Sequence, residues 1–280
     1  MDAHDFTGKI KFSATLTAEI SKTSPVIMAG DCAERIRRAS QLGYHAVELH
    51  WADPRKIPLD EIVSACENYN MKISAFATGR AYFQEGLNLT HDDDNIRKAS
   101  IERVFGFVDA AARCDAVVII GCIRGNIPAG EPDDVYLRRF AHSIHTVAKY
   151  AESRNVGIVL EAINRYENNY LNTAKETADF ISEFALPNVK ILLDTFHMNI
   201  EETSPAEAIT DCAGHLGYIH IADSNRRYAG AGHIDFRKIA AAVYAAGYQG
   251  YISAECLPLP DSETALSNWI KEIKDVFSIT

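Results

Sequence analysis

Four chemically active side chains recur in the second half of the chain, each at the end of a short apolar segment. They are Glu161 after Ile-Val-Leu, Asp194 after Ile-Leu-Leu, His220 after Tyr-Ile and Glu255 after Ile-Ser-Ala. The intervals between them are 33, 26 and 35 residues, close to the length of one strand–helix–strand repeat. Three carboxylates at one rim would repel one another, and a divalent cation removes that conflict. Three oxygens and one imidazole nitrogen suit Mn²⁺, Mg²⁺ or Co²⁺ better than a thiolate-preferring metal.

Eight short apolar segments alternate with stretches of helical periodicity, which predicts parallel strands joined by crossover helices. The predicted strands are Ile10–Leu16, Ala46–His50, Lys72–Thr78, Ala116–Cys122, Gly157–Ala162, Lys190–Thr195, Gly217–Asp223 and Tyr251–Cys256. Eight units in 280 residues predict a (β/α)₈ TIM barrel, with residues 1–280 as a single α/β domain. An open doubly wound sheet is the alternative, but residues 15–25 lack the glycine-rich turn typical of that fold.

The barrel hypothesis places the ends of all its strands at one rim, where barrel enzymes have their active sites. The four recurring residues would meet there, whereas separate caps at four unrelated strand ends are the alternative interpretation. Lys11, Lys72 and Lys190 fall at strand beginnings, on the opposite rim. A Schiff-base mechanism, which needs a lysine near the active site, is therefore disfavoured.

Further polar residues follow the same strand ends. Glu167, His197 and Arg226 lie in the segments after the fifth, sixth and seventh predicted strands, and we expect them at the same rim. His50 ends the second strand, and Glu48 shares its face because side chains alternate along a strand. We predict a substrate contact for His50, with a packing or hydrogen-bonding role as the alternative.

Composition excludes several classes of protein. The chain has 38 acidic and 28 basic residues and a net charge of −10, which disfavours nucleic-acid binding. No apolar run approaches the ~18 residues of a membrane span. Residues 1–9 lack the apolar core of a secretory signal, and we expect them to be a flexible tail. The six cysteines form no C-x-x-C pair, which is typical of free thiols in a reducing cytoplasm.

Longer motifs resemble the ketose 3-epimerases, a D-tagatose 3-epimerase-like group of xylose-isomerase-like sugar isomerase/epimerase barrels. The resemblance covers about residues 40 to 260, and its densest motifs are 161–167 (EAINRYE), 172–173, 194–202 (DTFHMNIEE), 220–226 (HIADSNR) and 232–233. The segments 78–82, 86–91, 118–121, 124–125 and 255–260 are similar to the branch that includes 5-keto-L-gluconate epimerase. Arg80 departs from that branch, in which we expect glutamine.

The resemblance implies a role for each site residue. Glu161, Asp194, His220 and Glu255 would bind one divalent ion, for which Mn²⁺ is expected first and Mg²⁺ or Co²⁺ are alternatives. Glu161 and Glu255 would also be the catalytic acid and base. Glu167, His197 and Arg226 would hold the sugar near its carbonyl group. The resemblance further implies a homodimer or homotetramer.

The expected reaction is epimerisation of a ketose or keto-sugar acid through an enediolate, with one glutamate serving each face of the substrate. An aldose–ketose or hydroxypyruvate-type isomerase, or a sugar dehydratase, would use the same metal core. An endonuclease IV-type phosphodiesterase needs more histidines at the early strand ends and is disfavoured. A catalytically silent sugar-binding barrel is also disfavoured, because all four ligand positions are filled.

The substrate's terminal group is left open by the sequence. A keto-sugar acid, such as a 5-keto-L-gluconate-like or tagaturonate-like compound, calls for an arginine at its carboxylate, and Arg80 or Arg124 would supply one. A free ketohexose needs no such residue. The loop of residues 230–232 (Gly-Ala-Gly) would hold a phosphate, or is an ordinary turn.

Overall fold

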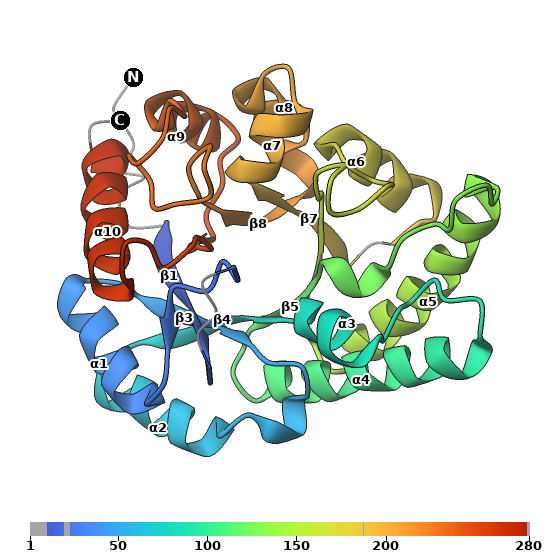
Figure 1. The fold of residues 1–280 in the computed structure, drawn as a ribbon, viewed down its shortest axis with the longest axis horizontal. Helices are drawn as coiled ribbons and strands as arrows, with labels where there is room; N and C mark the ends of the chain where they lie inside the picture. Colours follow the sequence, from blue (N-terminus) through green and yellow to red (C-terminus); the bar gives the residue numbers. More distant parts are fainter. Residues whose placement is uncertain (1–9, 20–22, 187, 279–280) are drawn as a thin grey trace.

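A closed ring of parallel strands forms the centre of the molecule (Figure 1). The computed structural model describes residues 10–19, 23–186 and 188–278, so the predicted tail at residues 1–9 lies outside the described residues. The strands are β1 (Lys11–Thr17), β2 (Met28–Ala29), β3 (Ala46–His50), β4 (Lys72–Ala77), β5 (Val117–Ile120), β6 (Ile158–Glu161), β7 (Val189–Asp194), β8 (Leu216–His220) and β9 (Tyr251–Ala254). Pairing of β1 with β9 closes the ring, which confirms the predicted TIM barrel.

Helices surround the ring on its outer side (Figure 1). They are α1 (Cys32–Leu42), α2 (Leu59–Asn68), α3 (Gly79–Glu85), α4 (Asp94–Ala112), α5 (Asp133–Ser153), α6 (Ala174–Glu183), α7 (Thr195–Glu201), α8 (Pro205–Asp211), α9 (Phe236–Ala245) and α10 (Ser262–Ser278), with short 3₁₀ turns at Pro54–Lys56, Cys122–Arg124 and Ala213–His215. Helices α3 and α7 begin directly after β4 and β7. They therefore lie at the carboxyl rim, where barrel active sites are built.

One strand of the structure was not predicted. The two-residue strand β2 pairs with the end of β1, through Leu16 and Met28. The hydroxyl of Thr15 accepts the backbone N–H of Ile27 at 2.9 Å and donates to the carbonyl of Ala254 at 2.9 Å. This contact holds the returning chain beside β1 without altering the eight-strand ring.

The lumen of the barrel is closed below the carboxyl rim by small and aromatic side chains. Ala75, Val159, Leu192 and Tyr218 belong to an apolar cluster there. The phenol of Tyr218 hydrogen-bonds the Ser74 hydroxyl at 2.8 Å, which satisfies its polar atom inside the barrel. The middle of the barrel interior is thus a packed core, and the cavity described below lies at the carboxyl rim.

Three lysines lie at the amino ends of the strands, opposite the carboxyl rim. Lys11 and Lys72 are exposed at the first positions of β1 and β4, and Lys190 is exposed near the start of β7. Their placement at the amino rim confirms the expectation that no lysine of these three reaches the active-site end. Within the described residues, no helix is long and apolar enough to cross a membrane.

Candidate active site

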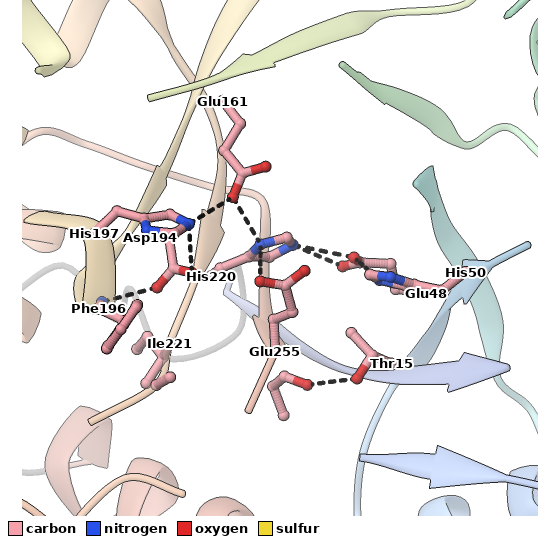
Figure 2. A network of polar contacts seen from close by, with 12 residues as sticks. Thr15, Glu48, His50, Glu161, Asp194, Phe196, His197, His220, Ile221 and Glu255 are labelled. Atoms are coloured by element: carbon pink, nitrogen blue, oxygen red, sulfur yellow. Dashed lines mark hydrogen bonds and ion pairs between the residues drawn. The ribbon is translucent and has the colours of Figure 1, made fainter. Parts of the chain in front are cut away.

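The four recurring strand-end residues form one cluster at the carboxyl rim (Figure 2). Each of Glu161, Asp194, His220 and Glu255 offers one donor atom, and these atoms all lie within 4.8 Å of one another. All four residues are buried, with at most 8% of their surface exposed. The structure therefore brings together the residues that were predicted as metal ligands.

Three buried atoms of this cluster, which lack hydrogen-bond partners within the described part of the chain, indicate that a metal ion fits there. Asp194 Oδ2, His220 Nδ1 and Glu255 Oε2 are buried and have no hydrogen-bond partner among the described residues. A buried polar atom without a partner costs free energy, and here three such atoms face one another. A divalent cation accepts a lone pair from each of them, so the donor set fits a hard or borderline ion.

The charges of the cluster are strongly coupled. Burial, and then the neighbouring Glu255, raise the pKa of Glu161 well above its ordinary value. Asp194 shows the same direction of shift for the same two reasons. Burial opposes ionisation of Glu255 as well, but His220 and then Arg226 hold its pKa below the ordinary value. His220 and Arg226 therefore do not supply enough positive charge to keep all three carboxylates ionised without a bound cation.

Glu48 of β3 orients the imidazole of this cluster. Both of its carboxylate oxygens lie 3.1 Å from His220 Nε2, and its side chain is fully buried. A carboxylate only accepts hydrogen bonds, so His220 Nε2 carries a proton, and Nδ1 is the ring nitrogen that would supply its lone pair to a metal ion. Burial alone would raise the pKa of Glu48, but His220 and His50 hold it well below the ordinary value.

His50 shares the same carboxylate. Its Nε2 atom lies 2.7 Å from Glu48 Oε1, and the ring lines the cavity above the cluster. The alternation of residues along β3 predicted that Glu48 and His50 face the lumen. That pattern gave no signal that Glu48 would contact His220, which is 172 residues away.

The three further polar residues predicted at this rim also reach the cluster. His197 Nε2 lies 3.6 Å from Glu161 Oε1 and 3.8 Å from Asp194 Oδ2. The guanidinium of Arg226 lies 2.5 Å from Glu167 Oε1 and 3.5 Å from Glu255 Oε2. Burial, and then the charge of Arg226, hold the pKa of His197 well below its ordinary value.

Arg226 is fixed by its backbone and by an aromatic ring. Its φ of +58° is unusual for a residue with a side chain and marks a strained turn at a functional site. The guanidinium carbon lies 4.7 Å from the centre of the Phe196 ring, an attractive cation–π distance. Both features aim the guanidinium at the carboxylates.

A cavity of about 480 Å³ opens over the cluster, within the range of small-molecule sites. Its walls include His50, Arg80, Phe83, Glu161, Glu167, His197, His220, Arg226 and Glu255. Arg80, in the first turn of α3, donates to the Thr17 hydroxyl at 2.7 Å. The cavity thus has an acidic end at the cluster and a half-buried cation on another wall.

Arg124 lies elsewhere. It is fully buried, and its guanidinium donates to the carbonyl of Glu161 at 2.6 Å and to Asn168 Oδ1 at 3.0 Å. It is not among the residues that line the cavity. The structure therefore places Arg124 behind the end of β6, where it supports the backbone of Glu161.

The loop of residues 230–232 already holds an anionic group of the chain itself. The Asp223 carboxylate accepts backbone N–H groups of Gly230 at 2.9 Å and of Ile234 at 3.1 Å. A Cβ atom at Gly232 would lie 2.3 Å from Asp223 Oδ1, which explains the glycine. The loop is thus folded around Asp223, and a phosphate would have to displace that carboxylate.

The barrel carries a cluster of three carboxylates and one imidazole at its carboxyl rim, beneath a polar cavity. This arrangement is typical of an enzyme with a divalent-metal centre. Residues 36–273 match the family model described as xylose isomerase-like TIM barrel. The chain belongs to this family.

Two relatives of this chain are named 3-epimerases. The chain is 30% identical over 252 residues to an L-ribulose 3-epimerase of Methylomonas sp. (strain DH-1), covering 86% of this chain and 83% of that protein. It is 32% identical over 228 residues to a D-psicose 3-epimerase of Ruminiclostridium cellulolyticum, covering 79% and 76%. Both are named epimerases, and the protein is accordingly an epimerase, an enzyme of the isomerase class.

A solved structure agrees with the fold. The crystal structure of a D-allulose 3-epimerase from Methylomonas sp., in complex with D-allulose, superposes with a TM-score of 0.81. The two chains are 24% identical, and the match covers 95% of this chain and 97% of the other. At this level of identity the likeness establishes the barrel architecture.

Replacing Glu48 by glutamine is expected to weaken divalent-metal binding about 10- to 100-fold, the usual cost of losing a carboxylate that orients a ligating histidine. The amide would present an N–H group to one of the two histidines that Glu48 now accepts from. Calorimetric titration with Mn²⁺ measures the effect, and Glu102→Gln, at an exposed position, is the control. Equal affinities in Glu48→Gln and the control would contradict the orienting role.

Gly121 leaves space for a metal-ligand candidate. A Cβ atom at this position would lie 2.5 Å from Glu161 Oε2, so Gly121→Ala must displace that carboxylate. We expect metal binding to weaken, by an amount on the order of the 1–3 kcal/mol that overpacking costs a protein core. Gly214→Ala is the matched control, because its Cβ atom would meet no heavy atom within 4 Å. Wild-type Mn²⁺ affinity in Gly121→Ala would show that the Glu161 carboxylate does not need this space.

Proposed function

We propose that this protein is a divalent-metal-dependent epimerase of a ketose or a keto-sugar acid. The reaction passes through an enediolate, with Glu161 and Glu255 as acid and base. The observation that carries the proposal is the buried cluster in which Glu161, Asp194, His220 and Glu255 place donor atoms within 4.8 Å of one another. This cluster forms one end of a cavity large enough for a monosaccharide.

The chemistry requires removal of a weakly acidic proton from the carbon next to a ketone. The resulting enediolate carries its charge on two neighbouring oxygens. A bound divalent ion, Mn²⁺ first and Mg²⁺ or Co²⁺ as alternatives, supplies positive charge beside those oxygens. Glu161, Asp194, His220 and Glu255 are the residues that would hold it.

Inversion of the carbon needs one group that accepts a proton on one face and another that donates on the opposite face. Glu161 ends β6, and Glu255 directly follows β9. Their carboxylates both approach His220 Nδ1, at 3.9 Å and 3.5 Å (Figure 2). Both side chains also line the cavity, and we assign one of them to each face of the planar intermediate. Which glutamate removes the first proton depends on the direction of the reaction.

The remaining polar groups bind and orient the sugar. Glu167 and Arg226, paired at 2.5 Å, offer an acceptor and donors to hydroxyl groups next to the reacting carbon. His197 offers a donor between Glu161 and Asp194. His50 forms part of the wall on the β3 side of the cavity.

Arg80 favours a keto-sugar acid over a free ketose. Its guanidinium lines the cavity and donates a hydrogen bond to the neutral hydroxyl of Thr17. A half-buried cation gains more from a ligand carboxylate than from a hydroxyl. A 5-keto-L-gluconate-like or tagaturonate-like substrate would place its carboxylate at Arg80 while its ketone lies at the cluster.

The assembly and its setting complete the proposal. We propose a homodimer or homotetramer, as the family resemblance implies. A cytoplasmic location fits the six cysteines, which are all free thiols.

The central test is an epimerisation screen of ketohexoses and keto-sugar acids after chelator treatment. We expect activity to disappear with the chelator, to return with Mn²⁺, and to place deuterium from D₂O on the inverted carbon. Glu255→Gln should lower turnover about 10²- to 10⁴-fold, the usual range for losing a general base, while Glu102→Gln should not. Inverted product without solvent deuterium would refute the two-glutamate route, and an aldose product would favour a 1,2-isomerase.

Substrate charge is tested separately at Arg80. Because a hydrogen bond to a charged group contributes about 1.5–3 kcal/mol, Arg80→Gln should lower kcat/KM for a keto-sugar acid roughly 10- to 150-fold. Its kcat/KM for the matching uncharged ketose should stay within about threefold of wild type. The exposed Arg237→Gln controls for net charge. Equal losses on both substrates would remove Arg80 as the carboxylate-binding residue.

A further inference from the structure

A single buried amide contacts two of the residues that surround the metal cluster. Asn164 follows β6 by three residues and is 1% exposed. Its Oδ1 atom accepts the backbone N–H of Tyr166 at 2.9 Å. Its Nδ2 atom lies 2.6 Å from His197 Nδ1 and 3.0 Å from Glu167 Oε1. The amide oxygen and the amide nitrogen of Asn164 therefore both form hydrogen bonds.

The orientation of the amide follows from these partners. A backbone N–H only donates, so the atom that faces Tyr166 must be the amide oxygen. The amide nitrogen then faces His197 and Glu167, and it has two hydrogens, one for each. The carboxylate of Glu167 accepts the first. The second hydrogen points at His197 Nδ1.

This orientation decides where His197 carries its proton. An amide N–H can bond Nδ1 only if that nitrogen has a free lone pair, so the proton of the neutral ring is on Nε2. His197 Nε2 lies 3.6 Å from Glu161 Oε1 and 3.8 Å from Asp194 Oδ2. The N–H donor of His197 is thereby directed toward the cluster.

The same amide reaches a third residue indirectly. Glu167, which accepts from Asn164, also pairs with Arg226 at 2.5 Å. The backbone carbonyl of Asn164 accepts the N–H groups of Glu167 and Asn168, each at 3.0 Å. The loop around Asn164 is thus tied at both side chain and backbone, and it holds Glu167 in place beside Arg226.

We propose that Asn164 is a positioning residue that fixes the Nε2–H tautomer of His197 and holds Glu167 against Arg226. The inference rests on the proposed function, since it assigns His197 as a hydrogen-bond donor to the substrate. A donor preset at Nε2 needs no reorientation when negative charge develops on a substrate oxygen. Asn164 is not among the residues that line the cavity or form the metal cluster.

An aspartate at position 164 distinguishes the effect of the His197 tautomer from the effect of side-chain size. Asn164→Asp keeps the size of the residue but presents an oxygen to His197 Nδ1, which favours a proton on Nδ1. Nε2 would then turn a lone pair toward the cluster, and the donor to the substrate would be lost. Asn164→Ala removes the contact altogether and leaves both tautomers accessible.

The tautomer is measured by ¹⁵N NMR of histidine-labelled protein, both ion-free and loaded with diamagnetic Mg²⁺. The His197 signals are assigned by their loss in His197→Gln. We expect Nε2–H in wild type, Nδ1–H in Asn164→Asp and a mixture in Asn164→Ala. Mg²⁺ affinity should stay within about threefold of wild type, because Asn164 is not a ligand. Nδ1–H in the wild-type protein would overturn the proposal without any variant.

Kinetics supply the second readout. Losing one preorganised donor should lower kcat of Asn164→Asp roughly 10²- to 10³-fold, and Asn95→Asp, at an exposed position on α4, should leave it unchanged. A shifted tautomer with wild-type kcat would overturn the role of Asn164 in the reaction. Because the NMR measurement uses no substrate, failure to find epimerase activity would refute the proposed function alone and leave the tautomer assignment standing.

Discussion

The mutual repulsion of three buried carboxylates is the constraint on which the rest of this structure depends. Glu161, Asp194 and Glu255 meet around His220 at the end of the barrel, where burial removes much of the solvation of their negative charges. Burial therefore raises the pKa of Glu161 and Asp194, and several donor atoms lack partners. A divalent cation relieves both problems, so the cost of assembling these acids is offset when the ion binds.

Three residues outside the cluster hold this arrangement. Glu48 on β3 sets the proton of His220, and Arg124 fixes the backbone of Glu161 from behind. Asn164 orients His197 and Glu167 on the cavity side. These contacts orient the His220 ring, the Glu161 backbone and the His197 ring so that their reactive groups face the cluster.

Much of the site was predictable because parallel strands have a fixed polarity. Once eight alternating segments indicate a barrel, residues that end consecutive strands must share a rim, and Glu161, Asp194, His220 and Glu255 do. The same reasoning placed His197 and Arg226 near them. Arg124, which the sequence offered with Arg80 as a partner for a substrate carboxylate, lies instead behind Glu161. A residue beyond a strand end can face the cavity or the outer layer, and only packing selects between them.

The sequence by itself determined the barrel, the rim and the chemical identity of the cluster, because these follow from strand periodicity and residue type. The tertiary structure alone decided the hydrogen-bond partners, since they join residues that are far apart along the chain. Glu48 reaches His220 across 172 residues, and Asp223 rather than a phosphate occupies the loop at residues 230–232. Local pattern cannot encode such contacts, because their free energy depends on which groups are buried together after the ring has closed.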